Sequence, residues 1–165
     1  INLEKIMKIF SSTVLLIVAI LLSPIALTDT LSAKQGDVSD VMAVIEKWAE
    51  LEHDLTAQAE LVRDDRVQIG GGIRQSNQAE NLAVQLMRYN ALMESWGGEP
   101  EMIVRIEDPL VRVYGDVAVA SFMRLFDIAP PGERANNTGT AWFSMVLVKD
   151  KGEWKIAHHH VSPAS

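Results

Sequence analysis

The stretch Gly152-Glu-Trp-Lys-Ile-Ala-His-His-His-Val-Ser162, close to the end of the chain, decides the fold. Alternate side chains of a β-strand point to opposite faces of the sheet. One face of this strand is therefore predicted to carry Trp154, Ile156, His158 and His160. Two apolar anchors followed by two imidazoles indicate a half-buried strand that ends in titratable groups. The pattern predicts a pocket without naming a reaction.

Three further strands are predicted ahead of this one. They cover 102–107 with an irregular continuation to 114, then 117–128 and 140–149, while the last strand covers 153–161. Gly115-Asp116 and Asp150-Lys151-Gly152 are typical of tight hairpin turns, and 129–137 is a longer polar loop. The order predicts an antiparallel meander.

Two helices are predicted before the strands. Apolar residues at three- and four-residue spacings mark the first helix, which Asp37 or Ser39 can cap: Val41, Val44, Ile45, Trp48, Leu51 and Leu55. The residues 66–69 form a possible short strand before three glycines, which are typical of a turn. Ser76 is expected to cap the second helix, and Gly97-Gly98 to end it. The apolar stripe of this helix is Ala79, Leu82, Ala83, Leu86, Tyr89 and Met93. Helices followed by a meander predict an α+β fold with helices on one face of a curved sheet.

Three stretches carry a family resemblance: the hairpin V-Y-G-D-V-A-V-A-S-F at 113–122, the pair W-F-S-M-V-L-V-K-D-K-G-E-W-K-I, and the ending W-K-I-A-H-H-H-V-S. In these stretches the chain resembles the NTF2-like superfamily, and within it the SnoaL-like branch. The ending is also similar to the final strand of the calcium/calmodulin-dependent kinase association domain. The resemblance covers roughly 38–162 and is more specific for fold than for activity.

The resemblance implies a cone, in which a strongly bent antiparallel or mixed sheet wraps around helices and encloses a pocket. Members are commonly dimers, and they include isomerases, dehydratases, epoxide hydrolases, polyketide cyclases and binding proteins. The groups that ketosteroid isomerases use are missing at the matching positions, and the relay of the epoxide hydrolases cannot be assembled from Tyr89, Asn90 and Arg124. Asp54 and Asp108 are loose candidates for the acidic base of the cyclases. Asp108 precedes Pro109, so a strand break is its simpler interpretation.

The start of the chain predicts export to the periplasm or the exterior. A leader is expected at 1–33, with 1–6 as upstream residues and a signal peptide at 7–33, where Lys8 supplies the charge and the apolar run covers 9–22. That run of roughly 14 residues is shorter than the ~20 needed to span a membrane, so cleavage after Ala33 is favoured over a retained anchor. The expected mature domain is 34–165, without membrane attachment once the leader is removed.

Composition excludes several classes of function. The formal net charge is −7, which makes nucleic acid and anionic lipid poor partners for the domain. The chain has no cysteine, so thiol chemistry and Cys-type zinc sites are excluded. No cofactor is predicted.

The histidines allow a catalytic and a structural interpretation. If their face is the concave one, His158 and His160 are candidate catalytic residues that act as acid and base. In the structural interpretation, they only hydrogen-bond helix ends or a carboxylate. His159 has the opposite parity and is expected to face a dimer interface or solvent.

Metal binding through the His158-x-His160 pair is a further alternative, although no metal ligand set is predicted. A third ligand is needed, and His53 is badly placed on its helix; Asp54 or Glu52 are the substitutes.

The aromatic side chains give the favoured hypothesis for function. Core packing explains most of them, but in a cone fold the same side chains line the pocket. The candidate pocket residues are Trp48, Tyr89, Phe122 and Trp142. We expect an exported homodimer that binds a small, largely apolar molecule. The alternative is a cofactor-free isomerase, dehydratase or hydrolase that uses the two histidines for proton transfer.

Overall fold

The computed structural model describes residues 23–135 and 139–164, and it divides the chain into two units, 1–37 and 38–165. Most of the predicted leader, 1–22, lies outside the described residues. Residues 23–33 belong to helix α2 (Ser23–Glu50). This helix starts well before Asp37 and Ser39, so the prediction that one of them caps its start is wrong. In the described part of the chain, no helix combines the length and apolarity that crossing a membrane requires.

The first predicted helix is interrupted near its end. Helix α2 ends at Glu50, and a 3-10 turn η1 (Leu51–His53) and a short helix α3 (Leu55–Ala59) follow it. Asp54 causes this break, because its side chain accepts a hydrogen bond from the backbone N–H of Ala57 and so caps α3. Asp54 therefore has a structural role here.

Helix α4 (Gln78–Trp96) confirms the second predicted helix, with one change at its start. Asn77, and not Ser76, is the cap, since its side chain accepts from the backbone N–H of Glu80. Gly97 ends the helix as predicted, with φ 75°, a left-handed conformation that glycine adopts without steric cost.

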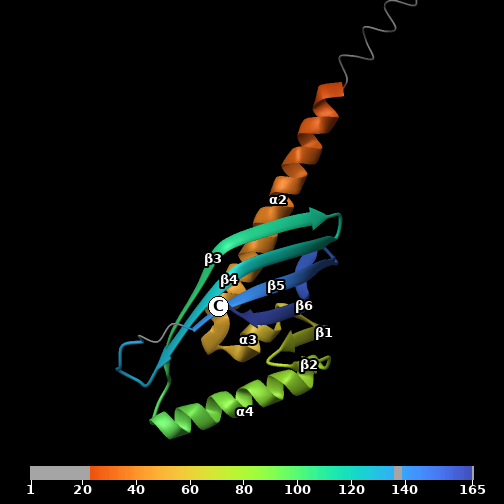
Figure 1. Ribbon diagram of the computed structural model, residues 1–165. Coiled ribbons are helices and arrows are strands. Elements are labelled where there is room, and N and C mark those ends of the chain that lie inside the picture. Colours follow the sequence, from red (N-terminus) through yellow and green to blue (C-terminus); the bar gives the residue numbers. More distant parts are fainter. Residues whose placement is uncertain (1–22, 136–138, 165) are drawn as a thin grey trace, which may run out of the picture. The chain divides into compact units, whose positions relative to one another are not determined.

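The sheet has six strands in the order β2-β1-β6-β5-β4-β3. Their bounds are β1 Val62–Gly70, β2 Ile73–Gln75, β3 Glu101–Tyr114, β4 Val117–Ala129, β5 Gly139–Asp150 and β6 Glu153–Pro163. The four long strands form the predicted antiparallel meander, and β3 is irregular between Glu107 and Leu110, around Asp108-Pro109. The sheet becomes mixed because β1 pairs with β6 in parallel. Figure 1 shows the curved, unclosed sheet with α3 and α4 on the side toward which it bends.

The core lies between the concave face of the sheet and the part of α2 that belongs to the second unit. Alternate residues of the strands pack there, as period-two burial requires: Val111, Ala118, Ala120, Phe122, Phe143, Met145, Leu147, Trp154 and Ile156. Val41, Ile45, Trp48 and Ala49 of α2 complete this core. The helical and strand periodicities of the sequence are thus confirmed.

A β-bulge in β6 reverses the predicted parity of the histidines. Leu147 of β5 pairs with Ile156, while its neighbour Val146 pairs with His158, so Ala157 is an extra residue without a partner. After the bulge, His159 takes the buried side and is 5% exposed. The prediction that His158 and His160 share a face with Trp154 and Ile156 is therefore wrong.

Candidate functional site

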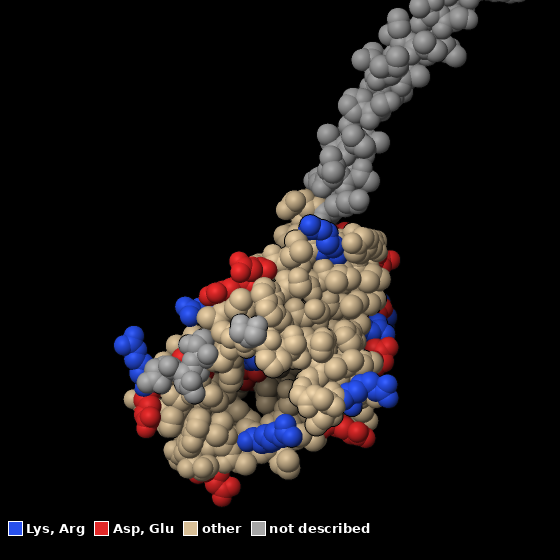
Figure 2. Space-filling model, in the orientation of Figure 1, with Lys and Arg blue, Asp and Glu red and all other residues tan. Residues whose placement is uncertain are grey.

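A cavity of about 290 Å³ opens beside the core, between the helices and the inner face of the sheet. Figure 2 shows the hollow above α4, with charged atoms at its back. Its lining contains many polar groups for so small a cavity: Glu52, Gln58, Arg66, Gln68, Gln78, Asn81, Gln85, Arg124 and His159. Trp48, Leu55, Val62, Phe143 and Val161 supply the apolar part of the wall.

Arg66 of β1 is the most unusual side chain of this cavity. It is only 2% exposed, and its Nη1 donates to Gln68 Oε1 and contacts the ring of His159. Its Nε is buried without a hydrogen-bond partner among the described residues. Within that part of the chain, no carboxylate forms an ion pair with it. Burial lowers the pKa of Arg66, as expected for a cation removed from water without a counter-charge.

His159 of β6 lies beside Arg66. Arg66 Nη1 is 3.3 Å from His159 Nε2 and 3.5 Å from Nδ1, so the guanidinium can donate to an unprotonated ring nitrogen. Burial lowers the pKa of His159 to about 3, and the positive charge of Arg66 is the next cause. The imidazole is therefore neutral near neutral pH and acts as a hydrogen-bonding group.

Arg124 of β4 differs from Arg66 because it has an acidic partner. Its Nη2 lies 2.8 Å from Glu52 Oε1, and its guanidinium carbon is 4.5 Å from the centre of the Phe126 ring. Trp48 and Phe143 flank the same cation at 5.4 and 5.6 Å. Burial lowers the pKa of Arg124, while Glu52 opposes that shift. The charge of Arg124 is therefore compensated within the protein, although its Nε, like that of Arg66, is buried without a hydrogen-bond partner among the described residues.

Glu52 has both of its carboxylate oxygens engaged. Oε1 pairs with Arg124, and Oε2 accepts a hydrogen bond of 2.9 Å from Gln58, whose amide also donates to the backbone oxygen of Trp48 at 2.8 Å. Among the residues that the structure describes, Glu52 is the only acidic one that lines the cavity. Two guanidinium groups and one carboxylate leave the cavity with one uncompensated positive charge, at Arg66.

The wall that α4 contributes is made of amides. Gln78, Asn81 and Gln85 line the cavity from one side of the helix, and Asn81 donates to Gln85 at 3.0 Å. Gln78 Oε1 is buried without a hydrogen-bond partner among the described residues. Because a terminal amide presents a donor at one end and an acceptor at the other, Gln78 offers a ligand either kind of hydrogen bond.

The predicted pocket residues are spread over different parts of the unit. Trp48 lines the cavity. Phe122 is fully buried and stacks on Phe143 at 5.5 Å, so it belongs to the core. Tyr89 lines a neighbouring cavity, and Trp142, 43% exposed, lies on the opposite face of β5 from Phe143.

The candidate catalytic histidines are not brought to this cavity. Neither His158 nor His160 is among its lining residues, and His160 is exposed. The expectation that His159 faces solvent or an interface is wrong, because the bulge at Ala157 turns it inward. A catalytic role for His158 and His160 remains a prediction.

A metal site also gains no third ligand in the described part of the chain, where no group of three His, Asp or Glu side chains converges. His53 is exposed, and the two substitutes are engaged elsewhere, Asp54 in capping α3 and Glu52 with Arg124 and Gln58.

Arg66 and the amides of α4 are the site residues that the sequence analysis missed. A signal was present, because Gln78, Asn81 and Gln85 recur at three- and four-residue spacing as a helical stripe. That stripe is polar, whereas the stripe predicted to be buried on this helix is apolar. For Arg66 the sequence contains no comparable signal, because it shows only an arginine that follows two aspartates at the start of a predicted strand.

Solved structures of similar fold come from bacteria and animals. An NTF2-like protein with a cystatin-like fold from Novosphingobium aromaticivorans has a TM-score of 0.67 at 15% identity, covering 87% of this chain and 90% of that one. The association domain of C. elegans CaMKII has a TM-score of 0.64 at 16% identity, covering 79% and 98%. At these identities, the likeness concerns the fold.

A comparison with curated proteins gives no match. The family comparison is positive, since the model of the SnoaL-like domain matches residues 41–165. This match covers most of the chain and all of the sheet and cavity described above. The chain belongs to the SnoaL-like domain family and has the NTF2-like fold.

Proposed function

We propose that this domain binds a small molecule bearing a carboxylate, which occupies the cavity with its charged end at Arg66. The observation that supports this proposal is a guanidinium that is 2% exposed and has no ion-pair partner among the described residues. The proposal narrows the predicted ligand, a small and largely apolar molecule, by adding an anionic group.

The physical argument concerns the cost of a buried charge. Removing a cation from water costs several kcal/mol, an effect that an opposite charge and full hydrogen bonding offset. Arg66 has neither in full, because Glu52 is engaged by Arg124 and Gln58. A carboxylate accepts charge-assisted hydrogen bonds from guanidinium N–H groups, often two at once. The neutral His159 and the amide of Gln78 add further hydrogen bonds for the bound group.

Proton-transfer catalysis has less support than binding. A general acid or base works best with a pKa near the operating pH, and the pKa of about 3 for His159 is far below neutrality. The carboxylate of Glu52 is held by Arg124 and Gln58. This favours a binding protein over an isomerase, dehydratase or hydrolase.

A matched pair of ligands tests the proposal. Phenylacetate and phenylacetamide have nearly the same shape, and only the first is charged at neutral pH. We expect phenylacetate to raise the melting temperature of the protein in a concentration-dependent way, because it binds the native state, and phenylacetamide to have little effect. Equal shifts from both compounds would contradict a role for the charge.

We also propose that the domain forms a homodimer through the convex face of the sheet. Apolar side chains are exposed there on neighbouring strands: Leu110, Tyr114, Val117, Val119 and Trp142, each between 39% and 68% exposed. Cross-strand pairing places Val117 opposite both Tyr114 and Val148, so this row of apolar side chains crosses β3, β4 and β5. Val119 adjoins it on β4 and pairs with Val146. Contiguous apolar patches of this kind mark interaction surfaces. A second copy brings the same patch and buries both at once.

Replacing Val119 by Asp is expected to convert the dimer to a monomer, because two carboxylates would be buried without partners. Sedimentation velocity measures the mass of each species. Met87→Asp is the matched control, since Met87 is 63% exposed on α4, away from this face, and the variant should remain dimeric. A monomeric parent protein would overturn the proposed dimer.

Export remains part of the proposal and rests on the sequence of the leader at 7–33. N-terminal sequencing of the protein recovered from the cell envelope or the medium checks it, with cleavage after Ala33 as the expected result. A protein that keeps residues 7–33 and stays inside the cell would overturn it.

A further inference from the structure

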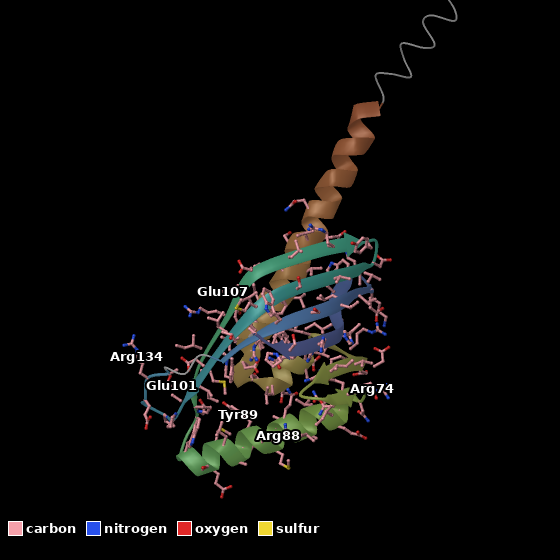
Figure 3. The ribbon with its side chains drawn as sticks, in the orientation of Figure 1. Arg74, Arg88, Tyr89, Glu101, Glu107 and Arg134 are labelled. Carbon is pink, nitrogen blue, oxygen red and sulfur yellow. The ribbon has the colours of Figure 1, made fainter. Side chains whose placement is uncertain are left out.

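A second cavity, of about 430 Å³, adjoins the site of Arg66. The two cavities have Glu52, Leu55 and Gln85 in common as lining residues, so they share a wall. The second cavity extends between α4 and the ends of β3 and β4. In Figure 3, Tyr89 extends from α4 into this region. A molecule that fills both cavities must therefore lie across the side chains that they share.

The chemistry of the second cavity differs from that of the first. Its wall is mostly apolar away from the shared side: Tyr89, Leu92, Met102, Phe126 and Ile128. In the described part of the chain, Arg88 is the only cationic residue of this wall, and it is exposed on α4. The pKa of Tyr89 is raised by burial and by the negative charge of Glu99, so its hydroxyl stays protonated near neutral pH. This wall suits hydrocarbon and offers few hydrogen bonds.

The Glu52–Arg124 ion pair separates the two environments. Glu52 lines both cavities, and Arg124 lines the first while stacking on Phe126 of the second. Because the two charges neutralise each other and Gln58 holds the second oxygen of Glu52, the pair offers a passing ligand no net charge. The uncompensated charge belongs to Arg66, which lines the first cavity and not the second.

We infer that the ligand is an amphipathic carboxylate whose head binds Arg66 and whose apolar tail crosses the Glu52–Arg124 pair into the second cavity. This inference rests on the proposed function and adds the class of the ligand to it. A short carboxylate fills only the first cavity. A longer ligand, with a straight hydrocarbon chain or an aryl-substituted chain, also buries its tail against the apolar wall of the second cavity. Removing both apolar surfaces from water adds to the binding free energy.

Titration calorimetry with butyrate, hexanoate, octanoate and decanoate tests this inference. Burial of one methylene in an apolar site is worth up to about fourfold in affinity. We therefore expect the affinity to rise by at least about tenfold from hexanoate to decanoate. Decanamide supplies the same tail with a neutral head and should bind at least about tenfold more weakly than decanoate.

Filling the second cavity gives a matched test within the protein. Leu92→Trp, and independently Ile128→Phe, should lower the affinity for decanoate by about tenfold or more and leave that for butyrate unchanged. Met87→Trp is the control on the same helix, because Met87 is 63% exposed and lines neither cavity. Circular dichroism of each variant establishes that it is folded.

The outcomes separate the two proposals. If butyrate and decanoate bind equally well, the amphipathic class is overturned and carboxylate binding at Arg66 stands. If decanamide binds as well as decanoate, the second cavity holds the tail but the charge at Arg66 contributes nothing, which overturns the proposed function. If no carboxylate binds to the folded protein, both are overturned.

Discussion

Replacement of Arg66 by Met is expected to abolish carboxylate binding while leaving the ligand-free protein at least as stable as its parent. Loss of one partner from a buried charge pair costs about 2–5 kcal/mol of binding free energy, which is at least about thirtyfold in Kd. In the unliganded protein, the same substitution removes a buried cation that lacks a counter-charge, so the free energy of unfolding should stay level or rise, by about 1 kcal/mol. Most substitutions of buried residues destabilise a protein. Loss of binding without loss of stability would therefore distinguish a ligand-binding Arg66 from a structural one.

Urea unfolding and calorimetry on the same preparations measure both effects. Arg74→Met is the matched control, because Arg74 is exposed on β2 (Figure 3) and lines neither cavity. That variant should bind decanoate as the parent does. An Arg66→Met protein that loses several kcal/mol of stability and still binds decanoate would show that Arg66 is structural.

Acidification from pH 6.5 to 4.5 is expected to lower the free energy of unfolding by about 2–3 kcal/mol through His159 alone. Its pKa is about 3 in the folded protein, against an ordinary value of 6.5. Between these values the unfolded chain binds a proton that the folded protein does not bind, so stability falls as the pH falls. Above pH 6.5 the imidazole is neutral in both states, and the full stability is present.

His159→Gln should flatten this part of the stability profile, because glutamine does not titrate. Urea unfolding at half-unit steps of pH measures the slope, and His160→Gln serves as the control because His160 is exposed on the same strand. The range from pH 6.5 to 4.5 lies mostly above the pH at which carboxylic acids usually titrate, so their contribution to the slope is small. An unchanged slope in His159→Gln would contradict the assigned pKa shift.

The large elements of the fold could be predicted because their burial follows a simple period. Ala118, Ala120 and Phe122 alternate along β4, and Val41, Ile45 and Trp48 recur along α2, so both patterns are legible in the sequence. The parallel pairing of β1 with β6 was not predicted. It joins residues about 90 positions apart, and nothing local in 62–70 marks a partner at the other end of the chain.

The orientation of the histidines could not be predicted, because it depends on one bulged residue. Ala157 has no feature that distinguishes it from a regular strand residue, and the bulge is visible only in the pairing of β6, whose register against both β5 and β1 shifts at this residue. A one-residue shift moves every later side chain to the other face. The run of three histidines therefore lies on the predicted strand, but the buried imidazole is that of His159 and not those of His158 and His160.

The candidate site was missed for a different reason. The interpretation of α4 assumed that its buried side is apolar, yet Ala79 and Ala83 are exposed while Gln78 and Asn81 are buried. A helix that borders a polar cavity turns amides inward, where they find partners in one another and in a ligand. Where a fold encloses a polar pocket, polar residues at helical spacing can mark the buried side of a helix as apolar residues do elsewhere.

The most direct test of carboxylate binding at Arg66 is a crystal structure of the protein with decanoate. We predict the carboxylate within about 3.0 Å of guanidinium nitrogens of Arg66, with the tail directed past Glu52 toward Tyr89 and Leu92. Decanoate bound with its carboxylate in solvent and only its tail in the protein would contradict the central role of Arg66, and so would a cavity that stays free of ligand at saturating decanoate.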